Sequence, residues 1–79
     1  MNVMDIKAIV GNYCKEFRLS LGMTLKDLSN DSGIGIKTIS AFEHGRSSNM
    51  MIIFQAYWNA CNGDVKLQKK FSDGLFKEL

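Results

Sequence analysis

Residues 24–45 read TLKDLSNDSGIGIKTISAFEHG, and this stretch decides how the chain folds. It begins with a threonine followed three residues later by an aspartate. Thr24 and Asp27 have the types and the spacing of a capping box, in which each side chain accepts a hydrogen bond from the other residue's backbone N–H. Met23 can pack on Leu28 beside this box. A helix is therefore predicted to begin at residue 25.

Two glycines in the middle of the stretch predict where this helix ends and the next begins. Gly33 suits the left-handed position after a helix, because it has no Cβ to crowd the backbone. Gly35 can then cap the following helix. We expect helices over residues 25–32 and 36–44, joined by a tight turn. This is the sequence form of a helix-turn-helix.

The helix predicted over residues 36–44 has two different faces. Ile39 and Phe42 are three positions apart and fall on one side, with Glu43 beside them. An unpaired carboxylate on that buried side would be costly, so Glu43 needs a partner. The opposite side is small, polar and weakly basic, and it carries Lys37, Ser40, Ala41 and His44, with Ile36 at its leading edge.

The chain before this motif predicts one longer helix. Apolar residues recur at steps of three and four over residues 5–21, the period of a helix with one buried face. Asn2 is a candidate cap for its start, and Gly22 for its end. Gly11 in its middle costs about 1 kcal/mol relative to alanine, and nothing local explains it.

The chain after the motif predicts two more helices. One covers residues 50–61, is apolar nearly all round, and can be capped by Ser48 or Asn49. The other covers about residues 64–79 and is expected to be interrupted near Ser72-Asp73-Gly74. The expected fold is all-α, a compact bundle of about five helices in a single domain over residues 1–79.

Composition limits the function classes. The 79 residues are 46% hydrophobic, lack proline and carry a net charge of +2, so one small core is expected and the total charge predicts no particular partner. Cys14 and Cys61 fit no metal or disulfide pattern and are expected to be core thiols. The first residues do not resemble a signal peptide, and no apolar run approaches the ~20 residues that cross a bilayer. A soluble, cytoplasmic protein without membrane contact is expected.

The motif resembles a known family, the lambda-repressor-like, or Xre/Cro-type, helix-turn-helix regulators. The resemblance covers roughly residues 6–61, and the segment from residue 64 lies outside it as a helical extension. It implies a helix-turn-helix DNA-binding domain with the helix from residue 36 in the major groove. The matching residues are Arg18, Gly22, Met23-Thr24, Leu28, Ser29, Ser32-Gly33-Ile34, Thr38-Ile39-Ser40, Phe42-Glu43 and Gly45-Arg46.

The resemblance also implies roles for individual residues. It places Ile36, Lys37, Ser40 and Ala41 at base edges, where lysine can donate to guanine and apolar groups can pack on thymine methyls. It places Lys26, Thr38, His44 and Arg46 near phosphates. Two of these have simpler alternatives. The Thr38 hydroxyl can hydrogen-bond merely within its own helix, and His44 can merely cap the helix end.

The resemblance further implies a partly buried ion pair between Arg18 and Glu43, which would link two helices. The alternative is that water solvates both charges. Breaking a buried pair from one side would cost about 3 kcal/mol or more.

The functional expectation is a transcriptional regulator, a repressor of the phage or mobile-element type, that binds double-stranded DNA as a homodimer on a palindromic operator. Its expected dimer interface comprises Tyr57, Trp58, Phe71, Leu75 and Phe76, because large apolar groups in excess of one small core mark a partner surface. The alternative is that the last helix folds back and buries them.

A second hypothesis uses the same fold as a protein-binding module, such as an antitoxin, an antirepressor or an adaptor, acting through the last two helices. Leu25 favours it, because relatives most often carry a phosphate-contacting glutamine there. No enzyme is predicted, since His44 lacks a carboxylate or nucleophile at useful spacing. No cofactor and no metal are expected.

Overall fold

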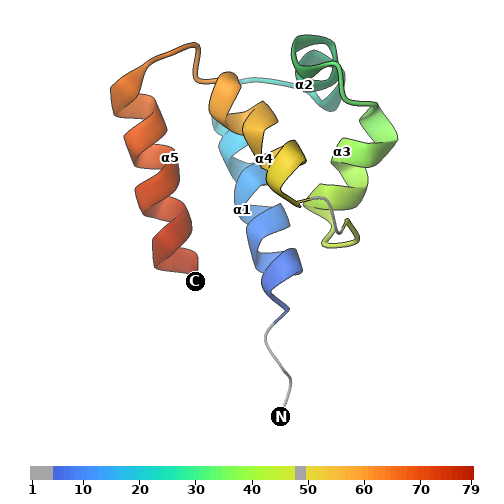
Figure 1. Cartoon of the computed structure of the whole chain (residues 1–79), viewed down its shortest axis with the longest axis horizontal. Helices are drawn as coiled ribbons and strands as arrows, with labels where there is room; N and C mark the ends of the chain where they lie inside the picture. The colour runs from blue at the N-terminus through green and yellow to red at the C-terminus, as the bar shows by residue number, and fades with distance from the viewer. Residues whose placement is uncertain (1–4, 48–49) are drawn as a thin grey trace.

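The computed structural model describes residues 5–47 and 50–79, and this part of the chain forms five helices and no strand. The helices are α1 (Ile6–Ser20), α2 (Leu25–Ser32), α3 (Ile36–Glu43), α4 (Met50–Asn59) and α5 (Val65–Glu78). Figure 1 shows α1 in the middle, with α2 and α3 on one side of it and α5 on the other. The all-helical prediction is confirmed. Within the described ranges, no helix has the length and apolar character needed to cross a membrane.

The ends of α2 follow from its own sequence. The Thr24 hydroxyl accepts from the Asp27 N–H at 3.0 Å, and the Asp27 carboxylate accepts from the Thr24 N–H at 2.9 Å, which completes the capping box. Gly33 ends the helix in the left-handed conformation with φ of 77°. The predicted span of 25–32 is confirmed, and the three-residue turn leads directly into α3.

Other helix ends differ slightly from the predictions. α1 begins at Ile6, because the Asp5 carboxylate accepts from the Ala8 N–H and caps it. The candidate caps Asn2, Ser48 and Asn49 lie outside the described residues. α3 ends at Glu43 with His44 as its C-cap, and α4 ends at Asn59 rather than at residue 61.

The predicted interruption of α5 is wrong. The helix continues through Gly74, where a Cβ would collide with the hydroxyl of Tyr13. That hydroxyl donates to the carbonyl of Phe71 at 2.8 Å, so the side chain of Tyr13 lies directly against the backbone of α5. Gly74 therefore allows a close approach between α1 and α5 instead of ending the helix.

Gly11 has a similar explanation. A Cβ there would collide with the carbonyl oxygen of Phe42 and lie 2.8 Å from that of Glu43, both of which are backbone atoms at the end of α3. A Cβ at Gly45 would likewise lie 2.8 Å from the Cα of Ala8, on the same side of α1. The two glycines let α1 and the end of α3 pack backbone against backbone.

The core is built around aromatic rings from three helices. Phe71 of α5 is fully buried, and its ring lies 4.4 Å from that of Phe17 and 4.9 Å from that of Phe54, measured between centroids. The ring of Tyr57 stacks on that of Phe71, with 6.5 Å between their centroids. α5 thus folds back onto α1 and α4.

This arrangement corrects the expected dimer interface. Tyr57 and Phe71 are buried inside one chain, so they are not available to a second one. Leu75 is also buried, and its 9% exposed part lines an apolar groove. Burial of these three is the alternative considered from the sequence. Only Trp58 and Phe76 of the expected set remain exposed.

Candidate nucleic-acid interface

α3 is anchored by one side. Ile39 and Phe42 are buried in the core, and the ring of Phe42 lies 5.6 Å from that of Tyr57 on α4. Deletion of either large side chain would leave a cavity, so these contacts fix the rotation of the helix about its axis. The rotation decides which residues of α3 face outward.

A buried ion pair fixes the far end of the same helix. The Arg18 Nε donates to Glu43 Oε2 at 2.8 Å and its Nη2 donates to Oε1 at 3.0 Å, a two-bond contact between a guanidinium and a carboxylate. Both residues are 5% exposed. The pair joins the end of α1 to the end of α3, so the solvated alternative does not apply.

The ion pair belongs to a larger network. The Arg18 Nη1 donates to the Met23 carbonyl at 2.7 Å, and the hydroxyl of Tyr57 donates to Glu43 Oε2 at 2.8 Å. Among the described residues, no buried side-chain nitrogen or oxygen lacks a hydrogen-bond partner. A satisfied network of this kind holds its members in one geometry.

Ionisation constants in the network follow its contacts. The hydrogen bond to Glu43 raises the pKa of Arg18, so its charge is retained. Burial, with the hydrogen bond to Glu43 as the next cause, raises the pKa of Tyr57 well above its ordinary value. Burial, with the Glu43 charge as a smaller cause, raises the pKa of Cys14 to about 12. Cys14 is therefore a protonated core thiol rather than a nucleophile.

Sequence reasoning missed Tyr57 and the Met23 carbonyl as members of this network. A tyrosine in an otherwise apolar helix was the available signal, since a buried hydroxyl needs a partner. The partner, Glu43, lies on the preceding helix α3, 14 residues earlier, and no helical period relates the two positions.

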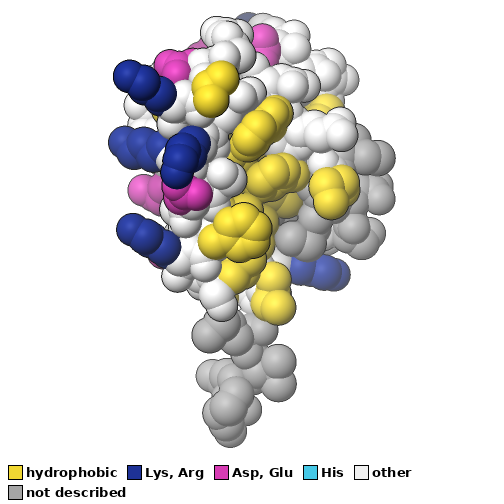
Figure 2. Space-filling model, turned by 60° about the vertical axis from the view of Figure 1, so that its left-hand side comes forward, with side chains coloured by type: hydrophobic (Ala, Val, Ile, Leu, Met, Phe, Trp, Pro, Cys, Tyr) yellow, Lys and Arg dark blue, Asp and Glu magenta, His cyan; other side chains and the backbone are white. Residues whose placement is uncertain are grey.

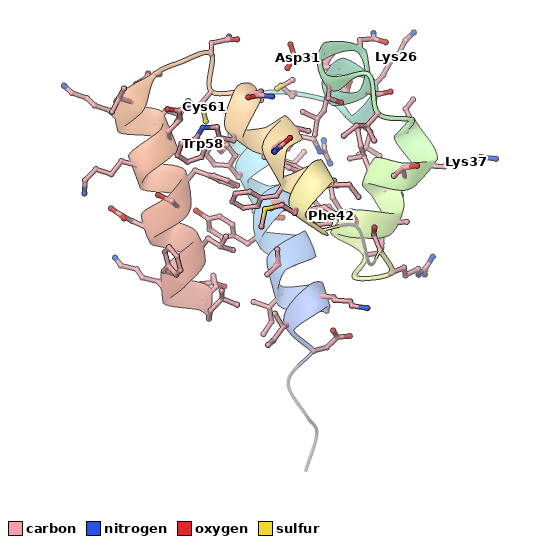
Figure 3. All side chains as sticks on the ribbon, in the orientation of Figure 1. Lys26, Asp31, Lys37, Phe42, Trp58 and Cys61 are labelled. Atoms are coloured by element: carbon pink, nitrogen blue, oxygen red, sulfur yellow. The ribbon has the colours of Figure 1, made fainter. Side chains whose placement is uncertain are left out.

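The opposite side of α3 faces solvent. Lys37 and Ile36 are exposed, while Ser40 and Ala41 are half-buried beside them, so the four expected base-reading residues share one side of the helix. Figure 3 shows Lys37 pointing away from the body of the molecule, on the side remote from α5.

The residues expected at phosphates surround this side. Thr38, His44 and Arg46 are exposed on and after α3, and Lys26 is exposed on α2. The Nδ1 of His44 lies 2.7 Å from the carbonyl oxygen of Ser40, so the imidazole also satisfies the helix end. The capping role considered for His44 is present, and its other ring nitrogen is left for an outside partner.

No protein-family model, curated protein or solved structure matches the chain. In the described part of the chain, no group of three or more His, Cys, Asp or Glu side chains is placed to hold a metal ion.

Proposed function

We propose that this protein is a sequence-specific double-stranded DNA-binding transcriptional regulator, a repressor that acts as a homodimer and places α3 in the major groove. One observation carries the proposal. α3 is held by buried apolar side chains and a buried ion pair on one side, while Lys37 and its neighbours project from the other. A recognition helix needs this combination, because base readout requires fixed side-chain positions.

The chemistry of the outward side suits the major groove, which is wide enough to admit an α-helix. Lys37 can donate to guanine O6 and N7, and the hydroxyl of Ser40 can donate or accept. Ile36 and Ala41 can pack on thymine methyls. Half-buried Ala41 is small, so it lets the helix approach the base pairs closely.

Phosphate contacts would position the helix without reading sequence. Arg46 follows α3 and Lys26 lies in the first turn of α2, so each can reach the backbone on one flank of the groove. Because few cations are available, one chain is expected to bind weakly and with a measurable dependence on salt.

Selection of bound duplexes from a random pool, followed by gel shifts across a salt series, tests the proposal. Log affinity should fall with log salt at a slope near 0.9 per phosphate neutralised, so about three contacts from one chain give a slope near −3. A selected sequence motif with such a slope supports the proposal. Failure to enrich any duplex, with a flat salt dependence, would refute it.

Two substitutions separate base reading from positioning. Lys37→Ala should relax the preference at one base pair. The difference in binding free energy between the preferred base and its alternatives should fall by about 1–3 kcal/mol. Arg46→Ala should weaken all sequences alike and reduce the salt slope by about 1. Lys70→Ala is the matched control, since it removes the same charge from α5 on the remote side of the molecule.

A protein-binding module is the second candidate function. The observation that favours it is an apolar groove lined by Val10, Met51, Phe54 and Leu75, which lies away from α3. Under this alternative the chain would form a stoichiometric complex with a different protein, and the random-pool selection would yield no duplex.

A further inference from the structure

The apolar groove opens between three helices. Its lining residues come from α1, α4 and α5, all four are apolar, and the cavity measures about 230 Å³. Figure 2 shows a stripe of hydrophobic side chains along this face, with charged side chains of both signs beside it. A surface of this kind is seldom left open on a small monomer.

Exposed apolar side chains extend the groove along the helices. Ile6 lies one turn before Val10 on α1, and Leu79 lies one turn beyond Leu75 at the end of α5. Phe76 and Leu79 are three positions apart and share one side of that segment. The exposed fractions are 56% for Ile6, 73% for Met51, 73% for Phe76 and 57% for Leu79.

The exposed area matches the needs of a dimer. With about 200 Å² for a fully exposed large apolar side chain, these four residues expose on the order of 500 Å². A standard interface buries about 800 Å² on each partner, and in homodimers about 65% of it is apolar. The patch therefore supplies roughly the apolar part of one side of a homodimer interface.

We propose that a second copy of this chain covers the groove, with Phe76 of each copy seated in the groove of the other. A benzene-sized group needs a cavity of about 150 Å³, so a phenyl ring can enter this one. The projecting ring and the groove that can accept it lie on the same face. A two-fold pair then forms both contacts at once, as an isologous interface requires.

The proposed dimer goes beyond DNA binding and can be tested without DNA. Sedimentation equilibrium of the full chain over a wide concentration range should show a reversible dimer. Phe76→Glu should raise the dissociation constant of the dimer at least tenfold, because it removes the inserted ring. Met51→Glu should raise it by a similar factor, because it places a charge in the lining of the groove. Val65→Glu is the matched control, since Val65 is 74% exposed on the same helix but three turns away, and it should leave the dimer intact.

Each outcome decides the matter once circular dichroism shows that the variants are folded. A wild-type chain that stays monomeric at the highest concentration overturns the proposal, whether or not another protein occupies the groove. A dimer that survives both groove substitutions also overturns it. A dimer that binds no DNA would refute the proposed DNA binding and leave this inference standing. A monomer that binds a selected duplex would refute this inference and the homodimeric part of the proposed function, but not the DNA binding.

Discussion

Glu43 connects the core to the candidate DNA-binding side. Its carboxylate accepts hydrogen bonds from Arg18 on α1 and Tyr57 on α4, so three helices meet at one buried group. The sequence predicted the Arg18 contact only through a family resemblance. The Tyr57 contact could not be predicted, because it depends on the rotation of α4 about its axis, which tertiary packing sets.

Removal of the Glu43 charge should be strongly destabilising. Glu43→Gln leaves the guanidinium of Arg18 buried without a counter-charge, which is expected to lower the free energy of unfolding by about 3–5 kcal/mol. Urea denaturation measures this, since urea does not screen charges. The triple variant Arg18→Met, Glu43→Leu and Tyr57→Phe should recover most of the loss, because it removes both charges and the hydroxyl that would otherwise lose its acceptor.

The exposed ion pair of Lys69 and Asp73 on α5 provides the control. Its N–O distance is 3.1 Å, but both side chains are mostly exposed, so Lys69→Ala should change stability by less than about 0.5 kcal/mol. If Glu43→Gln cost no more than Lys69→Ala, the buried pair would not be holding α3.

Helix ends that depend on local signals were predicted correctly, whereas features that depend on contacts between helices were not. α2 was predicted in full, because the capping box and Gly33 act within the segment itself. The break in α5 was predicted wrongly, because Gly74 makes room for the hydroxyl of Tyr13 on α1 rather than ending the helix. A glycine at a helix end and a glycine at a helix crossing look alike in one sequence. Helical period placed Ile36, Lys37, Ser40 and Ala41 on the outward side of their helix, and they lie together on one side of α3. Their base-reading role came from the family resemblance and stays a prediction.

Gly11→Ala should separate the two kinds of glycine. Alanine favours a helix by about 1 kcal/mol, but here its Cβ would meet backbone carbonyls that cannot rotate away. We expect a net loss of about 1–3 kcal/mol, as for overpacked cores. Asn12→Ala at the exposed neighbouring position is the control and should be neutral or stabilising. A stabilised Gly11→Ala variant would contradict the close crossing of α1 and α3.

The start of α2 should be sensitive to acid. Hydrogen bonds from Thr24, first from its backbone N–H, lower the pKa of Asp27 below its ordinary value of 3.8. Its contribution to stability is therefore complete above that value and is lost as the pH falls through the lower, folded-state pKa. Asp27→Asn should remove this part of the pH dependence below pH 4 in thermal melts. An unchanged acid profile would show that the box does not depend on the carboxylate.

The two candidate surfaces lie on opposite sides of the molecule. Figure 1 shows α3 and α5 separated by α1, and Figure 3 shows Lys37 pointing away from α5. A palindromic operator needs two recognition helices that face one duplex about one helical turn apart. A dimer formed through the groove beside α5 turns its α3 helices away from each other. The palindrome expected from sequence therefore does not follow from this dimer.

The dimer should instead hold two separate DNA segments. Because each α3 faces away from the groove, each can enter a different major groove without a clash between the duplexes. A biotinylated duplex carrying one selected site should then retain a second, fluorescent duplex on beads only when the protein is present. Phe76→Glu should abolish this retention while leaving the binding of one duplex to one chain intact, and Val65→Glu should preserve both. If the wild-type dimer instead bound two half-sites on one duplex cooperatively and retained no second duplex, its two-fold contact would have to lie beside α3 rather than at the groove.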